Sequence, residues 1–284
     1  LRVYLPQITM KRNAPTGTNP VRVLMVFTIL NRGGAETMVM NYFRAIDRTK
    51  VVFDFLVHRS EKGDYEEEAK RLGSHIFRLP GLNPMKLKSY KNAVSDFFDV
   101  HPEYKMVHGH CSELGYFIYK EAHHRGFQFI AAHGHNSPRG FDVKTPVRNL
   151  LKHLMRPYLT HYFTCGKESA QWLFGKRPAK EIIFLPNAIN SRSFAFDAVT
   201  RDKVRREHGW TDKFVVGNIS RFSHQKNHLF LIDIFADILR QDPSALLVLV
   251  GSGGNTADKV KKQVIGMGIG NNVIFLVNRS HITD

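Results

Sequence analysis

The chain has 284 residues, which is enough for two domains of ordinary size, each with its own hydrophobic core. An apolar fraction of 43% is typical of globular proteins, and no run approaches the roughly 20 apolar residues of a membrane-spanning helix. Cys111 and Cys165 are too few for a disulfide framework, which favours a reducing, cytosolic setting.

The chain is strongly basic, because 41 Lys and Arg residues against 25 Asp and Glu residues leave a formal net charge of +16. This charge favours anionic partners: the phosphates of a small ligand, an anionic membrane surface or a nucleic acid. A basic, soluble surface without a specific partner is the remaining interpretation. Charge alone does not decide between these possibilities.

Residues 1–20 are rich in Pro, Asn, Thr and basic side chains and show no hydrophobic period, so we expect a disordered arm there. The chain begins with Leu1, and Met10 would be a natural start, so the native protein could lack residues 1–9.

From residue 21, short apolar runs alternate with amphipathic stretches, which indicates βαβ units and a parallel sheet with helices on both faces. We therefore predict an α/β fold whose first Rossmann-like domain covers residues 21–186. Its expected strands are residues 21–28, 52–57, 75–79, 105–108, 127–132, 161–164 and 181–185. Its expected helices are residues 35–45, 65–72, 85–98, 114–124, 147–158 and 168–174.

A second series covers residues 187–284 and predicts a second Rossmann-like domain, with the linker near residues 186–200. Three strands are too few for a complete sheet of this type, so we expect this second domain to be incomplete. The expected strands are residues 214–219, 245–250 and 273–276, and the expected helices are residues 201–208, 229–239 and 257–267.

Gly33 and Gly34, followed by Ala35 and Glu36, form a turn directly after the first expected strand. Glycines between a strand and a helix let backbone N–H groups approach a phosphate, and the helix N-terminus adds a favourable partial charge. The glycines are adjacent and no third one follows at the right spacing, so this is not the dinucleotide fingerprint. A tight turn without a ligand is the alternative.

His133, His135 and Asn136 follow the strand expected at residues 127–132. Ligands of open α/β sheets collect at this edge, and these side chains suit hydrogen bonds to sugar hydroxyls or a phosphate. A zinc ion would need further ligands at fixed spacing, and no Cys or acidic cluster supplies them. With 15 histidines in the chain, two neighbours on a loop could also arise by chance.

Arg221 and Lys226 flank a turn between the strand expected at residues 214–219 and the following helix. Two cations and the free N–H groups of a helix N-terminus predict a diphosphate site, where each charge-assisted hydrogen bond contributes about 1.5–3 kcal/mol. A solvated basic loop is the alternative. Gly251 and Gly253 form a second glycine turn, after residues 245–250, which could line a nucleotide or only turn the chain.

Together these segments resemble the retaining glycosyltransferases of family 4, which have the two-domain GT-B architecture. The resemblance implies that residues 21–186 form the acceptor side and residues 187–284 the sugar-nucleotide side. The resemblance covers essentially residues 21–284, and the subgroup to which the chain is most similar serves bacterial capsular and exopolysaccharide assembly. Five segments occur in the family's order and spacing, at residues 33–36, 132–137, 185–190, 217–228 and 249–253.

The resemblance implies a role for each candidate residue. His133 would contact the donor sugar, and Arg221 and Lys226 would offset the charge that grows as the nucleotide leaves, so these three are expected to be catalytic. The residues implied at the donor phosphates are Gly33, Gly34, Arg221, Lys226, Gly251 and Gly253. The residues implied at the sugar or acceptor are Glu36, His133, His135, Asn136 and Asn187.

The implied reaction moves a hexose-type sugar, with retention, from a nucleotide-diphosphate sugar to a saccharide or lipid-linked saccharide acceptor. A UDP-sugar is the favoured donor, and no cofactor or metal is expected, since family members generally need none. The implied location is cytoplasmic, with attachment to the inner face of the cell membrane as one interpretation.

The chain also departs from the family pattern. Family members carry, beyond the point where this sequence ends, two glutamates separated by seven residues that contact the donor sugar and ribose. Position 188 is Ala, where the family commonly has Gly. We therefore expect residues 1–284 alone to turn over poorly, and a non-catalytic fragment that binds sugar nucleotides is the alternative function.

Two other classes compete with this interpretation. A dinucleotide-dependent oxidoreductase would share the alternating pattern, and Asp54 lies near the position of its acidic residue, but the glycine spacing fails. A specific nucleic-acid binder would explain the charge, but no helix-turn-helix, zinc-finger or RNA-binding signature accompanies it.

Residues 144–156 predict a basic amphipathic helix, with Leu150, Leu151, Leu154 and Met155 as its apolar side chains. Such a helix could rest on an anionic membrane beside a lipid-linked acceptor. The alternative is an ordinary surface helix whose apolar side packs on the first sheet.

Overall fold

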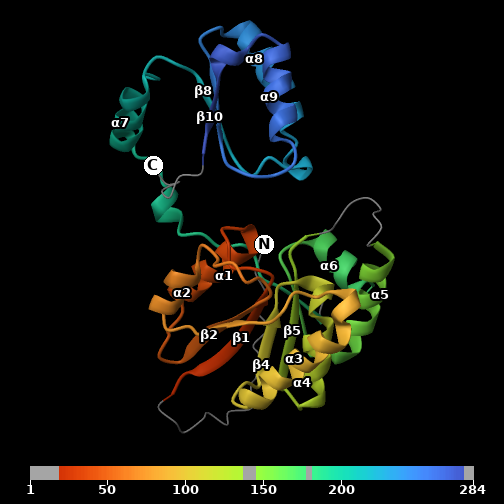
Figure 1. The fold of residues 1–284 in the computed structure, drawn as a ribbon. Coiled ribbons are helices and arrows are strands. Elements are labelled where there is room, and N and C mark those ends of the chain that lie inside the picture. Colours follow the sequence, from red (N-terminus) through yellow and green to blue (C-terminus); the bar gives the residue numbers. More distant parts are fainter. Residues whose placement is uncertain (1–18, 137–144, 177–180, 278–284) are drawn as a thin grey trace. The chain divides into compact units, whose positions relative to one another are not determined.

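A computed structural model describes residues 19–136, 145–176 and 181–277 of the chain. The chain divides into two compact units, Leu1–Ile189 and Asn190–Asp284, and each contains a parallel sheet (Figure 1). The boundary predicted between residues 186 and 187 lies close to this division. Most of the arm predicted at residues 1–20 lies outside the described residues.

The first unit is built on a seven-stranded parallel sheet with the order β3-β2-β1-β4-β5-β6-β7. β1 has the nearly continuous apolar sequence of a strand that is covered on both faces, and its last five residues are buried. Strands β2 and β3 follow β1 toward one edge of the sheet, whereas β4 to β7 follow on the other side of β1. The strand order therefore reverses between β1 and β4, which makes this the topological switch point. The strands are β1 (Val21–Phe27), β2 (Val51–Val57), β3 (Ile76–Arg78), β4 (Met106–Gly109), β5 (Phe129–Gly134), β6 (His161–Thr164) and β7 (Ile182–Phe184).

Helices cover both faces of this sheet. The helices α1 (Gly34–Ala45) and α2 (Glu66–Arg71) pack on one face, where they enclose a core with β1 and β2. The other face is covered by α3 (Leu87–Val100), α4 (Tyr116–His124), α5 (Thr145–Met155) and α6 (Lys167–Phe174). Short 3-10 helices lie at Pro84–Lys86, Ser112–Gly115 and Arg156–Tyr158. Each fully buried aromatic or aliphatic side chain, such as Phe43 or Tyr90, stabilises these cores by about 1.5–3 kcal/mol.

The second unit has a three-stranded parallel sheet with the order β10-β9-β8. Its strands are β8 (Val215–Ile219), β9 (Leu246–Val250) and β10 (Val273–Leu276). Its helices are α7 (Ala198–His208), α8 (His228–Gln241) and α9 (Ala257–Gly266), with 3-10 helices at Ser191–Phe194, His224–Lys226 and Gly270–Asn272. Helices α8 and α9 lie on the same face of the sheet, where Phe235 and Val260 pack with Leu247 and Leu249 of β9 (Figure 1).

The predicted fold class, two Rossmann-like α/β units, is confirmed. One difference affects the candidate site, because β5 runs through Gly134 and the strand expected at residues 127–132 is displaced toward the C-terminus. His133 therefore belongs to the strand and not to a loop. The physical reason is continued pairing with β6, in which His133 lies opposite Phe163 and Gly134 lies opposite Thr164.

Candidate functional site

The candidate residues of the first unit gather at the edge of the sheet where β1, β4 and β5 end. The backbone N–H of His110, just after β4, donates to the carbonyl oxygen of Val26 in β1 at 2.8 Å. The turn with Gly33 and Gly34 follows β1, and His133 lies at the end of β5. Because these strands flank the switch point, they end at the edge where open α/β sheets bind ligands.

The glycine turn is partly filled by a carboxylate of its own helix. Gly33 is the N-cap of α1 with an extended backbone (φ −97°, ψ 169°), and a Cβ added there would lie 2.2 Å from a carboxylate oxygen of Glu36. The N-terminus of α1 attracts negative charge, which favours the Glu36 side chain in this position. An anion that binds at this turn therefore has to displace the Glu36 carboxylate. Gly34, in contrast, has open space where its side chain would be.

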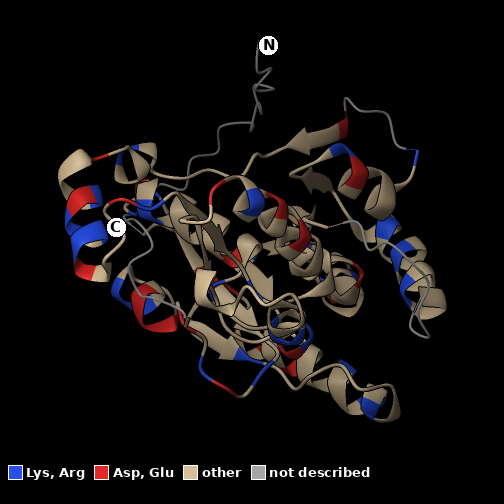
Figure 2. Ribbon diagram, turned by 90° about the horizontal axis from the view of Figure 1, so that it is seen from above, with Lys and Arg blue, Asp and Glu red and all other residues tan. Residues whose placement is uncertain are grey.

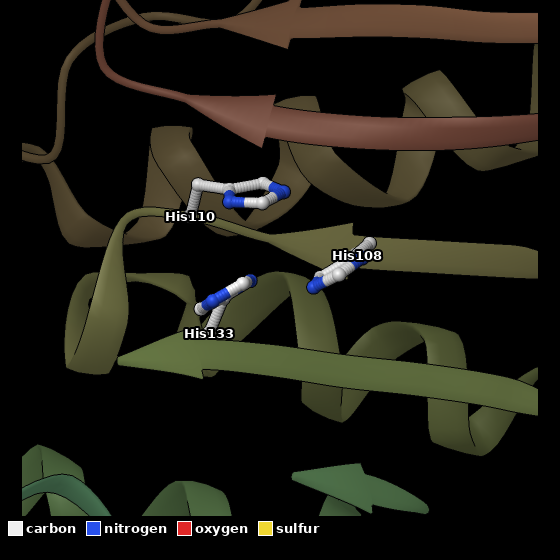
Figure 3. Close-up of side chains that lie close together, drawn as sticks. All are labelled: His108, His110 and His133. Atoms are coloured by element: carbon white, nitrogen blue, oxygen red, sulfur yellow. The ribbon is translucent and has the colours of Figure 1, made fainter. Parts of the chain in front are cut away.

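Four histidines form a stacked group at the ends of β4 and β5, which we call the histidine cluster: His108, His110, His133 and His135 (Figure 3 shows the first three). The ring centroids of His108 and His110 are 4.4 Å apart, and those of His133 and His135 are 4.2 Å apart. His110 and His133 link the two pairs at 5.2 Å. The Nδ1 atom of His110 also lies 2.8 Å from Nε2 of His135, a hydrogen bond in which one ring donates and the other accepts.

Strand pairing brings these rings together. β4 and β5 are parallel neighbours, with His108 opposite Ala131 and Gly109 opposite Ala132. Alternate residues of a strand share one face, so the His-x-His pair of each strand projects on the same side as that of its neighbour. Two pairs that are 25 residues apart in the chain thus become adjacent in space.

The cluster consists of neutral imidazoles. Burial lowers the pKa of His108 to about 3 and the pKa of His133 to about 2, with repulsion from neighbouring histidines as the smaller cause. Burial also lowers the pKa of His135 to about 4 and holds the pKa of His110 well below its usual value. A protonated ring in this place would have lost its hydration without gaining a counter-charge.

Several nitrogens of the cluster have no hydrogen-bond partner among the described residues: both ring nitrogens of His133, Nε2 of His108 and Nε2 of His110. Each buried polar atom without a partner costs about 1–3 kcal/mol. His133 is 0% exposed, so a sugar can contact its ring only after the cluster opens. The sugar contact assigned to His133 stays a prediction.

Sequence analysis missed His108 and His110. The signal that could have found them is the repeated His-Gly-His triplet, which ends both the fourth and the fifth strand, at residues 108–110 and 133–135. For a zinc site at His133 and His135, Cys or acidic residues were considered as the further ligands. The additional nitrogens come instead from a neighbouring strand.

The remaining candidates of the first unit lie at its surface. Asn136 is exposed directly after the cluster, and Asn187 is exposed in the segment after β7. That segment is held against α1, because Asn41 Nδ2 donates to the Ala188 carbonyl oxygen at 2.8 Å and the Tyr42 hydroxyl donates to that of Pro186 at 2.8 Å. Asn187 is thereby fixed beside α1, the helix that begins at the glycine turn.

In the second unit, Arg221 and Lys226 lie on the loop between β8 and α8. Both are exposed, and neither forms an ion pair with another described residue. The 3-10 helix His224–Lys226 begins between them, and α8 begins after both. The loop thus presents two cations and helix N–H groups at the C-terminal edge of the second sheet, an arrangement that suits an anion.

A buried histidine of α8 packs against this loop. His228, 2% exposed, stacks on Phe222 with centroids 4.6 Å apart, and its Nε2 lies 3.1 Å from the Ser220 hydroxyl oxygen. The loop backbone turns at Asn227, which has the left-handed φ of 48°. These contacts fix the backbone on both sides of Arg221 and leave its side chain free to reach a ligand.

Close backbone packing explains why glycine is needed at two positions of the second glycine turn. A Cβ on Gly251 would lie 2.1 Å from the Ser220 carbonyl oxygen, and one on Gly254 would lie 2.0 Å from that of Phe222. The Phe222 N–H donates to the Gly253 carbonyl oxygen at 3.2 Å. The turn therefore packs directly against the loop that carries Arg221, and Gly253, at φ 67°, has open space around it.

Asp54, the acidic residue that the oxidoreductase alternative needs at its ribose site, is engaged inside the fold. The buried Asp54 carboxylate accepts hydrogen bonds from the Arg22 guanidinium, the Tyr104 hydroxyl and the His75 backbone N–H, each at 2.6 Å. Asp54 also pairs with Leu24 in the middle of the β1–β2 ladder, away from the strand end. Its oxygens are engaged inside the fold and are not available to a ribose.

The basic residues do not gather on one helix. Figure 2 shows Lys and Arg on several helices, with Asp and Glu among them. Part of the positive charge is paired, as in Arg44 with Glu68 at 2.6 Å and Arg125 with Glu121 at 2.8 Å. This distribution of charge does not favour a nucleic acid over the other anionic partners.

Helix α5 differs from the predicted basic amphipathic helix in which side chains face the protein and which face solvent. Arg148 pairs with the buried carboxylate of Glu113, and Lys152 donates to the Trp172 carbonyl oxygen at 3.1 Å, so both cations point toward the protein. Leu151 and Met155 are buried, as the surface-helix alternative expects. The exposed face instead carries apolar side chains: Val147, Leu150 and Leu154. Lys144 lies outside the described residues.

Among the described residues, no helix has both the length and the apolar content that crossing a bilayer requires.

Comparison with known proteins shows which proteins and which fold the chain is similar to. Residues 200–283, which include the loop with Arg221 and Lys226, match the family model of group 1 glycosyl transferases. The chain is 32% identical over 255 residues to the proposed glycosyltransferase EpsF of Bacillus subtilis, covering 85% of this chain and 65% of that protein. It is 21% identical over 244 residues to the GDP-mannose-dependent alpha-(1-6)-phosphatidylinositol monomannoside mannosyltransferase of Mycolicibacterium smegmatis, covering 86% of this chain and 63% of that protein. The chain thus spans just under two thirds of the length of these two relatives.

Solved structures share the fold. The Anabaena protein HepE, in complex with UDP and glucose, superposes with a TM-score of 0.74 at 19% identity, covering 93% of this chain and 71% of that one. A glycosyltransferase from Rickettsia africae superposes with a TM-score of 0.68 at 13% identity, covering 93% of this chain and 70% of that one. The chain thus shares the two-unit α/β fold of the GT-B class, as the sequence predicts.

Proposed function

We propose that the chain is a glycosyltransferase that moves a sugar from a nucleotide-diphosphate sugar to a saccharide or lipid-linked saccharide during surface polysaccharide synthesis. The observation that carries the proposal is the match of residues 200–283 to group 1 glycosyl transferases, because that stretch includes the exposed cations of the β8–α8 loop. The 32% identity to EpsF supports the assignment to sugar transfer.

In the proposed mechanism, Arg221 and Lys226 hold the diphosphate of the donor. Negative charge grows on the diphosphate as the bond to the sugar breaks, and two fixed cations stabilise that charge more in the transition state than in the ground state. The cations supply the counter-charge, so the transfer needs no metal ion. Exposed, unpaired side chains suit this role because they lose no ion pair when the ligand arrives.

At the first unit we propose that the sugar meets the residues that end β5. His135 and Asn136 lie toward the surface and offer hydrogen bonds to hydroxyl groups, and His133 joins them once the cluster opens. Gly33 and Gly34 would face the donor phosphate once the Glu36 carboxylate has moved aside, and Glu36 would contact the sugar or the acceptor. A UDP-hexose is the proposed donor, in line with the complex of HepE with UDP and glucose, and the anomeric configuration is retained.

Calorimetric titration of the full chain with UDP, GDP, ADP and UDP-glucose tests the phosphate site. Replacing either cation by Ala (Arg221→Ala or Lys226→Ala) is expected to weaken binding at least about tenfold, because each removes a charge-assisted hydrogen bond. The matched control is Lys259→Ala with Lys262→Ala, which removes two exposed cations from α9 of the same unit. Binding equal in the loop variants and in this control would rule out the proposed site.

Transfer is measured separately, with radiolabelled sugar nucleotides, a lipid extract as acceptor and a chelator present throughout. Label that reaches the acceptor, and is lost with Arg221→Ala, supports the enzyme. Nucleotide binding without transfer would favour the sugar-nucleotide-binding fragment instead, and saturable NAD binding would favour the oxidoreductase.

We also propose that the protein acts at the cytoplasmic face of an anionic membrane, through α5. Val147, Leu150 and Leu154 occur at helical spacing and are 56%, 57% and 40% exposed. An exposed apolar stripe suits insertion at the boundary between lipid headgroups and acyl chains, and the net charge of +16 adds attraction to anionic lipid. This location would place the transferase beside a lipid-linked acceptor.

A further inference from the structure

The histidine cluster has the spacing of a metal-ion site. One ligand nitrogen from each of His108, His110 and His133 lies within 4.8 Å of the others (Figure 3). His108 lies on β4 and His133 on its neighbour β5, and the N–H of His110, just after β4, donates to the Val26 carbonyl oxygen of β1, so hydrogen bonds between strands hold all three backbones in place. The side chains therefore start close together before any ion arrives.

The missing hydrogen-bond partners point to an occupant. Buried polar atoms in proteins are nearly always satisfied by another group, a water or an ion. Here Nε2 of His108, Nε2 of His110 and both nitrogens of His133 are buried without a partner in the described chain. A single cation between the three rings would satisfy one nitrogen of each ring at once.

The chemistry of the ligands selects the class of ion. Neutral imidazole is the ligating form of histidine, and it suits Zn²⁺, Cu²⁺ and Ni²⁺, whereas Mg²⁺ and Ca²⁺ prefer oxygen ligands. The three candidate ligands are all imidazoles, and no described carboxylate joins them. Three histidines with a fourth position left open form a known type of zinc coordination.

The surroundings of His110 resemble the outer shell of a metal site. Its Nδ1 is hydrogen-bonded to Nε2 of His135 at 2.8 Å, which leaves its Nε2 for an ion. The ring also stacks flat on Phe27, with centroids 4.6 Å apart. A partner on the second ring nitrogen fixes the tautomer and orientation of a ligating histidine.

The rings have to turn to bind an ion. The His108 and His133 rings are only 10° from parallel, whereas coordination needs the lone pairs to converge on one point. The rotation about the Cβ–Cγ bond of histidine has a broad energy profile, so this change does not require the backbone to move.

We propose that His108, His110 and His133 bind one divalent transition-metal ion of the Zn²⁺ class, with His135 as a positioning residue behind His110. This site is separate from the phosphate site at Arg221 and Lys226. It shares His133 with the proposed sugar contact, so an ion on His133 and a sugar on His133 exclude each other, but ion binding itself does not require sugar transfer.

Titration of the chelator-treated full chain with Zn²⁺ and Co²⁺ tests the proposal, using calorimetry and the visible absorption of bound Co²⁺. One ion per chain is expected. His108→Phe and His110→Phe keep an aromatic ring in the stack, and each should weaken binding at least about 100-fold, whereas His135→Gln should weaken it about 10–100-fold. His123→Phe and His124→Phe, at exposed histidines of α4, are the matched controls and should leave affinity unchanged.

X-ray absorption spectroscopy of the Zn²⁺-loaded wild-type chain counts the imidazole ligands directly, so the proposal stays testable even where a variant fails to fold. Three imidazoles support it. The proposal is overturned if no ion binds, if binding survives both His108→Phe and His110→Phe, or if the spectrum contains fewer than three imidazoles.

Discussion

Glycines at the two sheet edges differ in how much space surrounds the position where a side chain would begin. Gly251 and Gly254 have carbonyl oxygens 2.1 and 2.0 Å from where a Cβ would stand, so the backbone itself excludes a larger residue. Gly34 has nothing within 4 Å of that point. The described chain around Gly34 would accommodate a side chain. A ligand could still require glycine at this position, because its phosphate would approach the backbone closely.

Replacing Gly34 and Gly251 by alanine separates these reasons. Gly34→Ala is expected to stabilise the first unit by about 0.5–1 kcal/mol, because alanine loses less conformational entropy at the start of α1. The same variant should lower sugar transfer, since the methyl group occupies the space proposed for the ligand. Gly251→Ala should destabilise the second unit by at least about 1 kcal/mol, because two backbone segments must separate.

Urea unfolding measures both variants, and the tryptophans allow each unit to be followed alone. Trp172 lies in the first unit and Trp210 in the second, and the chain has no other tryptophan. Trp210→Phe therefore provides the background for Gly34→Ala, and Trp172→Phe the background for Gly251→Ala. A Gly34→Ala variant with lower stability, or with undiminished transfer, would contradict the role given to this turn.

At the scale of elements, α5 illustrates how tertiary contacts assign the two sides of an amphipathic helix. Its sequence contains cations and leucines at helical spacing, but it does not say which face packs inward. The buried Glu113 carboxylate and the Trp172 ring select Arg148 and Lys152, whose Nζ lies 4.3 Å from the centre of that ring. The exposed apolar face is the consequence, because the helix cannot bury both sides.

Substitution of the exposed leucines tests the membrane role of α5. Leu150→Gln with Leu154→Gln is expected to reduce binding to vesicles that contain anionic lipid by at least about tenfold, since two apolar side chains no longer leave water. Co-sedimentation at low salt measures the partition. Met85→Gln with Val100→Gln, which changes two other exposed apolar residues of the first unit, is the control and should bind as the wild type does. Absence of co-sedimentation by the wild-type chain would exclude the membrane role.

At the scale of the whole molecule, buried histidines make the stability of the first unit sensitive to acid. His58 is a clear case: its Nδ1 lies 2.9 Å from the Phe27 carbonyl oxygen and its Nε2 lies 2.9 Å from the Tyr90 hydroxyl, so a neutral ring satisfies both partners. Burial lowers the pKa of His58, against a smaller opposing effect of the Phe27 carbonyl.

The sign of the pH dependence follows from that shift. Below the unfolded pKa of about 6.5, the unfolded chain binds the proton more readily than the folded chain, so stability is complete above this pH and falls as the pH drops through it. His58→Gln removes this titration and keeps groups that can hydrogen-bond. Its unfolding free energy should change with pH less steeply than that of the wild type, by up to about 1.4 kcal/mol per pH unit. Urea unfolding between about pH 7.5 and about pH 5.5 measures both slopes, and equal slopes would refute the role of His58.

Composition and pattern predict a division between residues 186 and 187, and the two compact units of the structure meet between Ile189 and Asn190. The structure extends the first unit to Ile189, because Asn41 and Tyr42 of α1 hold the carbonyl oxygens of Ala188 and Pro186. These hydrogen bonds join residues that are 144 and 147 positions apart. Periodicity in a local window carries no information about such partners.

The alternation of strands and helices, the parallel sheets and the position of each candidate loop after a strand can be predicted from local patterns, because periodicity, glycine turns and charge act over short distances along the chain. Which side chains meet depends on tertiary packing. It placed β4 beside β5, so that two His-Gly-His triplets form one buried cluster, and it engaged Asp54 with Arg22 and Tyr104 inside the fold. The physical reason is that strand order and burial depend on the packing of the whole unit, which joins residues far apart in the sequence.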